Sequence, residues 1–110
     1  MFKADLKRGS MELLILAVLE ARARHGYDIG KRLKACSEGR LDLQVSTLYS
    51  ALYRMEKRKL IKGRWLEKEG ERRRCHYSLT AKGRRELEQQ REEWRAFVET
   101  VEMVVGGEHA

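Results

Sequence analysis

Hydroxyl, phenol and cationic side chains share one side of a helix predicted to begin near Ser46. Leu48, Leu52 and Met55 are spaced i, i+4 and i+7, which predicts an amphipathic helix with its apolar stripe toward the core. The other face carries groups that can hydrogen-bond to bases or neutralise phosphates: Ser46, Thr47, Tyr49, Ser50, Tyr53, Arg54, Lys57 and Arg58. The major groove of DNA admits one helix, and short hydroxyls near its start can reach base edges. A solvated face on an ordinary core helix would show the same pattern.

A second group of cations follows a predicted turn. Residues 64–67 and 72–79 have the pattern of two strands joined by a polar turn at 68–71 that contains Gly70, which predicts a β-hairpin. Arg72, Arg73 and Arg74 open the second strand, and at most two of them share a face because side chains alternate along a strand. We expect either Arg72 with Arg74, or else Arg73, to contact the DNA backbone or minor groove. Trp65 is expected to pack on the helical body.

The remaining pattern predicts the elements that position these groups. Ser10 is a candidate N-cap for a first helix, a second helix runs over 27–36 and ends near Gly39, and Ser46 or Thr47 can cap the third. Residues 41–45 alternate and predict a minor strand, while Thr80 is a candidate cap for a long last helix. The predicted fold is mainly α with a small β-hairpin: a winged helix-turn-helix plus a long C-terminal dimerisation helix. The expected domains are a DNA-binding domain at 1–80, the dimerisation helix at 81–105 and a flexible tail at 106–110.

Two helices carry more apolar surface than one short chain can cover. The first is apolar on nearly all sides, and a chain of 110 residues buries only about two-thirds of its unfolded surface. The last helix has apolar residues at intervals of 7, 4, 3 and 4, similar to the heptad seam of a coiled coil. We therefore expect a homodimer. Its predicted interface residues are Leu13, Leu16, Leu87, Trp94, Val98, Val101 and Val105.

Charge and composition narrow the class of function. The net charge is +7, but residues 1–85 hold 22 Lys and Arg against 10 Asp and Glu, whereas residues 86–110 hold 2 against 7. A basic body suits a polyanionic partner. The sequence shows no signal peptide or membrane span, so we expect a cytoplasmic protein with no membrane partner. Two separated cysteines and three scattered histidines predict no metal site, we expect no cofactor, and no catalytic motif points to an enzyme.

Four segments in order resemble the signature blocks of the PadR family: RGSMELLIL at 8–16, HGYDI at 25–29, TLYSALYRME at 47–56 and YSLTAKGR at 77–84. The resemblance covers about residues 7–95 and is greatest to the short branch with a single C-terminal helix. Val45 and Ser46 stand where many members have a small residue, and the hairpin has more arginines than usual. These departures concern the operator sequence rather than the class.

The resemblance implies a bacterial transcriptional regulator, usually a repressor, that acts as a homodimer on a pseudo-palindromic double-stranded DNA operator. It implies dimerisation through the last helix with help from the first. Some relatives bind flat aromatic compounds between paired helices, so a small aromatic effector at Trp94 is an expectation beside the simpler one of Trp94 as dimer core. The alternative functions are a protein-partner module and a nucleic-acid-binding protein without sequence preference. The sequence does not give the operator, the target genes, an inducer, or whether the protein represses or activates.

Overall fold

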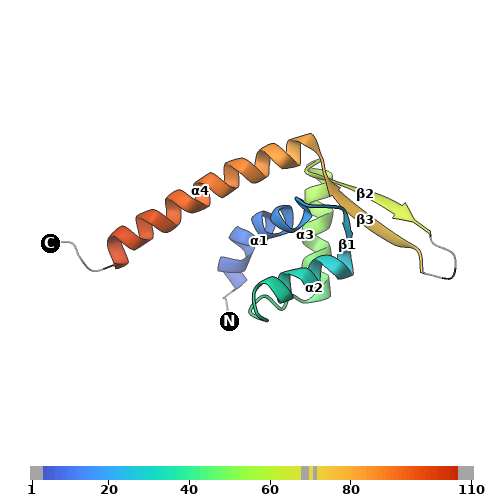
Figure 1. Ribbon diagram of the computed structural model, residues 1–110, viewed down its shortest axis with the longest axis horizontal. Coiled ribbons are helices and arrows are strands. Elements are labelled where there is room, and N and C mark those ends of the chain that lie inside the picture. Colours follow the sequence, from blue (N-terminus) through green and yellow to red (C-terminus); the bar gives the residue numbers. More distant parts are fainter. Residues whose placement is uncertain (1–3, 68–69, 71, 107–110) are drawn as a thin grey trace.

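The computed structural model describes residues 4–67, 70 and 72–106, and these form helices around a small antiparallel sheet (Figure 1). In chain order the elements are α1 (Ala4–Leu19), β1 (Arg24–His25), α2 (Gly26–Cys36), α3 (Val45–Lys57), β2 (Ile61–Leu66), β3 (Arg74–Leu79) and α4 (Ala81–Val105). The first three helices and the sheet form a body from which α4 projects, so the molecule measures 65 × 29 × 21 Å. None of the described helices has both the length and the apolar character of a membrane span.

The core lies around α1. Ile15, Leu16 and Leu19 of this helix are fully buried, and α1 contacts α2, α3, β3 and α4. The rest of the buried apolar cluster comes from α1 itself, from these elements, and from the start of β2 with the residue before it: Met11, Ile29, Leu33, Leu48, Ala51, Leu52, Met55, Leu60, Ile61, Tyr77 and Leu87. The apolar character that α1 shows on nearly every side is explained by this central position.

Two predicted helix starts were wrong. Helix α1 begins at Ala4, so Ser10 lies inside it rather than at its cap. Helix α3 begins at Val45 with Gln44 as its N-cap, so Ser46 and Thr47 belong to its first turn. A serine or threonine also fits inside a helix when the preceding residues continue it, and a local sequence pattern does not separate the two cases.

The predicted minor strand at 41–45 was also wrong. Residues 41–44 form no regular element, although Leu41 and Leu43 pack on the core. Their alternation therefore arises from a loop that lies over the body and buries every second side chain. Gly39 precedes this loop with φ +84°, and its amide donates to the Lys34 carbonyl at 2.8 Å, as the predicted helix end requires.

The sheet has the strand order β1-β3-β2, with both pairings antiparallel. The predicted hairpin is confirmed as β2 and β3, which pair from Ile61 with Leu79 to Leu66 with Arg74. Strand β2 thus begins three residues earlier than predicted, and β3 begins at Arg74. The short β1, which the sequence did not predict, pairs with β3 through Arg24 with Tyr77 and His25 with His76. Of the predicted turn, Gly70 has φ +78°, and residues 68, 69 and 71 lie outside the described residues, as do 107–110 of the predicted tail.

Thr80 joins the end of α3 to the start of α4. Its hydroxyl accepts the Gly83 amide at 2.9 Å, which confirms the predicted cap, and donates to the Lys59 carbonyl at 2.6 Å. Its own amide donates to the Leu60 carbonyl at 3.1 Å. A Cβ added to Gly83 would lie 2.0 Å from that same Leu60 oxygen. The direction in which α4 leaves the body is therefore fixed by backbone contacts that only glycine permits.

We expect Gly83→Ala to destabilise the protein by roughly 1–3 kcal/mol, because the new methyl group must displace the Leu60 backbone. Urea unfolding followed by circular dichroism measures the change. Gly30→Ala is the matched control, since its Cβ would lie 3.3 Å from the mobile end of the Leu48 side chain. Equal stability of the two variants would contradict the close contact between α4 and Leu60.

Candidate nucleic-acid interface

Helix α3 has one buried and one exposed face. Leu48, Ala51, Leu52 and Met55 pack into the core, as the spacing predicted. The other side carries seven of the eight polar residues singled out from the sequence, all exposed on a single helix: Ser46, Thr47, Tyr49, Ser50, Tyr53, Arg54 and Lys57. Tyr53 is 64% exposed, and the Lys57 ammonium lies 5.6 Å from the centre of its ring. This face presents hydroxyls near the start of the helix and cations near its end.

Tyr49 has a packing role that the sequence did not reveal. Its hydroxyl lies so near Gly26 that a Cβ there would sit 2.3 Å from the oxygen. Gly26 opens α2 and is buried, so the tyrosine ring holds the start of α2 against α3. The ring remains 43% exposed and can also meet a ligand. Substitution of Tyr49 would therefore change both the surface and the packing of the two helices.

Arg58, the C-cap of α3, is turned to a different partner from the one predicted. Its guanidinium forms an ion pair with Glu12 of α1. The other carboxylate oxygen of Glu12 accepts from the Gln90 amide of α4 at 2.8 Å. A contact between Arg58 and DNA would have to compete with this ion pair. Arg58 therefore serves first to join the end of α3 to α1.

The arginines of the hairpin fall into different environments. The Arg73 guanidinium lies 4.9 Å from the Trp65 ring centre and 3.9 Å from a Glu67 oxygen. Trp65 is 59% exposed, so the expectation that it packs on the body was wrong, and its partner Arg73 is the residue just before the opposite strand. Arg74 reaches from β3 to His25, and Arg72 is exposed just before β3. The structure separates Arg73 from Arg74, as the alternation of side chains predicted, and which of the arginines contact DNA stays a prediction.

The start of α2 adds groups that sequence reasoning missed. Nδ1 of His25 accepts the Asp28 amide at 3.1 Å and so caps α2, and Tyr27 beside it is exposed, with the Lys31 ammonium 5.5 Å from its ring centre. Buried Arg24 donates to the Val18 carbonyl at 3.2 Å and to the Asp28 carboxylate at 2.8 Å, which ties α2 to the end of α1. The HGYDI block was the signal available, but histidine is an uncommon N-cap.

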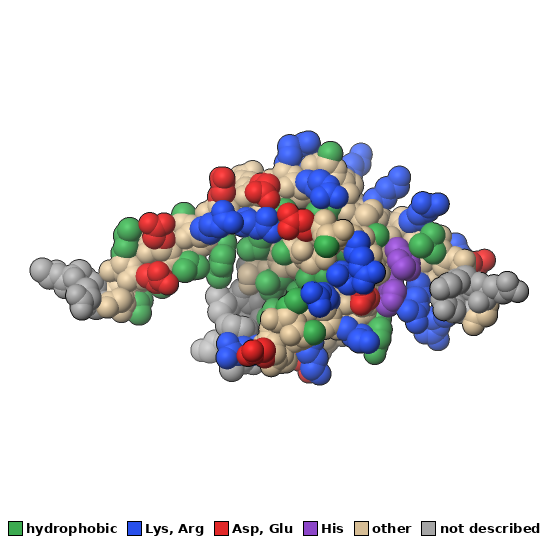
Figure 2. All heavy atoms as spheres, viewed as in Figure 1, with side chains coloured by type: hydrophobic (Ala, Val, Ile, Leu, Met, Phe, Trp, Pro, Cys, Tyr) green, Lys and Arg blue, Asp and Glu red, His purple; other side chains and the backbone are tan. Residues whose placement is uncertain are grey.

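The electrostatics of this region favour particular charge states. The hydrogen bond from Arg24 lowers the pKa of the Asp28 carboxyl below its usual value. Burial, reinforced by the neighbouring Arg74 guanidinium, lowers the pKa of His25, which therefore stays neutral at neutral pH. Figure 2 shows Lys and Arg gathered over the body and hairpin, whereas carboxylates and apolar side chains lie along the outer half of α4.

The outer half of α4 has a large apolar surface. Its exposed side chains include Trp94, Phe97, Val101, Met103, Val104 and Val105. Val98 and, on α1, Leu13 are half-buried. Leu16 and Leu87 differ from the sequence-based expectation, because the chain's own core covers both and leaves no surface for a second subunit.

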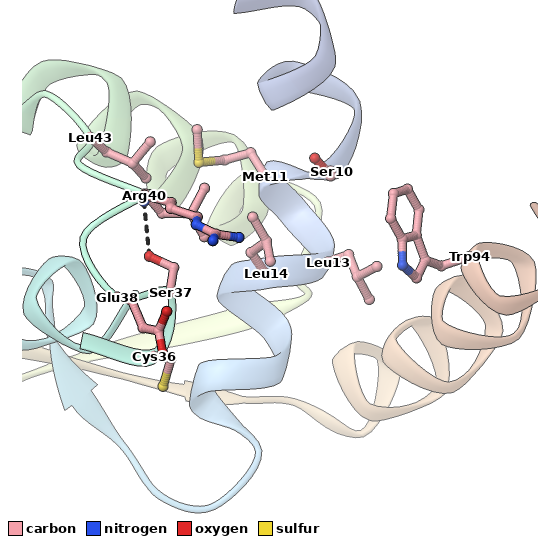
Figure 3. Close-up of a pocket in the computed structure, with 11 residues that line it drawn as sticks. Ser10, Met11, Leu13, Leu14, Cys36, Ser37, Glu38, Arg40, Leu43 and Trp94 are labelled. Atoms are coloured by element: carbon pink, nitrogen blue, oxygen red, sulfur yellow. Dashed lines mark hydrogen bonds between the residues drawn. The ribbon is translucent and has the colours of Figure 1, made fainter. Parts of the chain in front are cut away.

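A cavity of about 400 Å³ lies between α1 and the segment that follows α2 (Figure 3). Its apolar lining includes Met11, Leu13, Leu14 and Leu43, and Trp94 of α4 stands across α1 at its edge. The volume falls within the range of small-molecule sites, roughly 300–1,000 Å³. Trp94 is therefore placed where an apolar ligand or a second protein chain could meet it.

The order of helices, the exposed face of α3 and the basic hairpin define a winged helix-turn-helix. The chain matches the model of the transcriptional regulator PadR-like family over residues 15–89. It is similar to a transcriptional regulator from Clostridium thermocellum, with TM-score 0.85 and 29% identity over 94% of this chain and 97% of the other. It is also similar to a PadR family regulator from Clostridium difficile, with TM-score 0.74 and 35% identity over 90% of this chain and 100% of that one.

The fold is shared with Bacillus subtilis PadR, whose structure was determined in complex with operator DNA. That likeness has TM-score 0.66 and 24% identity, and covers 73% of this chain and 45% of the other. The family match spans more than half of the sequence, and the chain belongs to the PadR-like family of transcriptional regulators. This is a family of regulators and not of enzymes.

We expect Asp28→Asn to destabilise the protein more near pH 7 than near pH 2. A carboxyl whose pKa is lower in the folded state stabilises the fold above its ordinary pKa, and that stabilisation is lost as the pH falls through the lowered value. Urea unfolding at the two pH values measures the difference. The control is Asp42→Asn, whose exposed pair with Lys34 spans 3.7 Å and should contribute little at either pH. A loss of stability that is the same at both pH values would contradict the role of the Asp28 charge.

Proposed function

We propose that this protein is a sequence-specific double-stranded DNA-binding regulator, acting as a homodimeric repressor on a pseudo-palindromic operator in the cytoplasm. The observation that carries the proposal is the exposed face of α3, which combines hydroxyls, phenols and cations beside a basic hairpin. Membership of the PadR-like family supports it, as does the fold shared with a PadR protein that binds operator DNA.

We propose different roles for the two ends of α3. A helix fills the major groove, which is about 12 Å wide, and its first turns come nearest the bases. Ser46, Thr47 and Ser50 would hydrogen-bond to base edges there, and Arg54, one turn further on, can pair with a guanine. Lys57 near the end of the helix would neutralise a phosphate. Tyr49 and Tyr53 would lie along the sugar-phosphate wall, and Arg72 and Arg73 of the hairpin would contact the adjacent backbone or minor groove.

The proposed dimer is formed by the apolar face of α4 and the exposed edge of α1. Trp94, Val98, Val101 and Val105 lie within one stripe of a 3.6-residue helix, and three of them are exposed in the single chain. Burial of this stripe against a second α4, with Leu13 of α1 at its margin, would stabilise a twofold pair. In this arrangement residues 1–80 are the DNA-binding domain and residues 81–105 the dimerisation helix.

The cavity beside Trp94 supports a response to a small aromatic effector. A flat apolar compound seated against this ring would bind where α1 and α4 meet the second subunit. A change in the angle between the paired α4 helices would then alter the distance between the two α3 helices. Since half-sites lie about 34–36 Å apart, one turn of DNA, such a change would weaken operator binding.

We expect Arg54→Ala to weaken binding to a duplex from the promoter next to the protein's own gene by about 10- to 100-fold, the effect of losing one bidentate base contact. Binding to a scrambled duplex should change much less. Lys57→Ala should instead weaken both to the same extent and reduce the slope of log K against log[salt] by about two, one unit for each subunit of the dimer. Gel shifts with competitor DNA measure these effects.

Arg95→Ala, on the projecting part of α4, is the control for loss of a positive charge. Weak binding of the natural protein that is equal on every duplex would favour a nucleic-acid-binding protein without sequence preference over the proposed regulator. Absence of binding at low salt would favour a protein partner for the same surface.

We expect Val101→Asp to convert the dimer to monomers, because the new carboxylate would lie in the apolar contact between the two α4 helices. Met103→Asp is the matched control. Met103 is also exposed and apolar, but two residues further along it points to the opposite side of the helix. Light scattering after gel filtration measures the mass. A natural protein that is monomeric, or a Val101→Asp variant that remains dimeric, would contradict the proposed interface.

A further inference from the structure

His25 is approached by two hydrogen-bond donors, one at each ring nitrogen. The Asp28 amide lies 3.1 Å from Nδ1, and Nη1 of Arg74 lies 2.9 Å from Nε2. A neutral imidazole has one N–H and one lone pair, so it can accept only one of these donors. The amide of Asp28 belongs to the first turn of α2 and has no carbonyl partner within the helix, so the ring must accept it through Nδ1.

Nε2 therefore carries the ring proton. Its N–H faces an N–H of the Arg74 guanidinium, and neither group can accept a hydrogen bond from the other. Protonation of the whole ring would not relieve this contact, because it would place a proton on Nδ1 and break the cap. Burial and the Arg74 charge also lower the pKa of His25 and keep it neutral. An oxygen atom that accepts from both Nε2–H and Arg74 would satisfy the two groups at once.

Among the described residues, the surroundings of His25 are rich in cations. His76 pairs with His25 across the strands, with ring centres 5.4 Å apart, and Lys31 stands over Tyr27, whose ring stacks on His25 at 6.3 Å. Asp28, the acid nearest to His25, already accepts from Arg24 at 2.8 Å. None of the described carboxylates pairs with Arg74. An anion from outside the chain would therefore meet two hydrogen-bond donors and a positive potential at this place.

The position of this cluster indicates the source of the anion. Tyr49 of α3 packs on Gly26, the residue after His25, so the cluster lies at the edge of the α3 surface and on the side of the hairpin. Figure 2 shows the two described histidines between the body and the cations of the hairpin. A duplex seated on α3 would bring its sugar-phosphate backbone to this edge.

We propose that His25 Nε2–H and the Arg74 guanidinium jointly bind one backbone phosphate of duplex DNA, while Nδ1 of the same ring caps α2. This inference rests on the proposed DNA-binding function and adds a phosphate site outside α3 and the hairpin tip. The ring thereby couples DNA contact to the start of α2. A phosphodiester oxygen is the ligand, and Arg74 neutralises its charge.

The test uses the full chain and a mixed-sequence duplex of about 30 base pairs, long enough for two half-sites. His25→Asn retains a good helix cap but removes the ring donor, so the thermal unfolding midpoint should change little. Binding should weaken about fivefold for each subunit, as expected for one lost hydrogen bond. Arg74→Gln should weaken binding about tenfold or more for each subunit and reduce the salt slope of the dimer by about 1.8, because two phosphate contacts are lost, whereas His25→Asn should leave the slope unchanged.

The double variant distinguishes a shared phosphate from two separate contacts. If both groups hold the same oxygen atoms, His25→Asn should have little further effect once Arg74→Gln is present. Arg95→Gln, remote from the cluster, is the control and should bind as the natural protein does. Affinities of the single variants equal to that of the natural protein, or fully additive losses in the double variant, would overturn the proposal.

Nitrogen NMR of the His25 ring gives a second readout. The free protein should contain the Nε2–H form, and its signals should shift with duplex at micromolar concentration. A ring with its proton on Nδ1, or signals that move with inorganic phosphate but not with duplex, would overturn the proposal. A natural protein that binds no duplex would refute the proposed function. Normal binding by His25→Asn and Arg74→Gln would refute only the phosphate site.

Discussion

The burial of α1 is the constraint on which the rest of the structure depends. Its apolar residues point to nearly all sides, so the helix is stable only where neighbours cover it all round. Helices α2, α3 and α4 and strand β3 each supply part of that cover, and they are held in one arrangement because they share the same apolar partner. The positions of the groups on the surface that we propose to face DNA follow from this arrangement.

Polar contacts then set the orientation that apolar packing leaves free. Arg24 ties α2 to the end of α1, Thr80 ties α4 to the loop after α3, and Tyr49 holds α2 against α3. Each of these contacts is directional, whereas burial of leucine or isoleucine is not. Buried Arg24, half-buried Thr80 and partly exposed Tyr49 thus all lie at joints between elements.

The sequence correctly predicted the elements whose periodicity is strong. It did not predict features that depend on contacts between residues far apart in the chain. Leu48, Leu52 and Met55 placed α3 and its exposed face correctly, and Thr80 and Gly70 marked a cap and a turn. The loop at 41–44 has the alternation of a strand because it packs on the core, and two-residue β1 is too short to have a pattern. Leu16 and Leu87 were assigned to a dimer because an apolar position does not indicate whether its own chain or a second chain covers it. The roles of His25 and Trp65 depend on Arg74 and Arg73, which only the folded hairpin brings near.

The two contacts of Glu12 would also affect the geometry of a dimer. One of its oxygens holds Arg58 at the end of α3 and the other holds Gln90 on α4. In a twofold pair, the distance between the two copies of α3 would depend on this carboxylate and on the first half of each α4 helix. Neither of these would contact a base. Base preference and half-site separation would then depend on different residues. A lineage of such proteins can therefore adapt to a wider or narrower operator while reading the same bases, or keep the operator length while reading new ones.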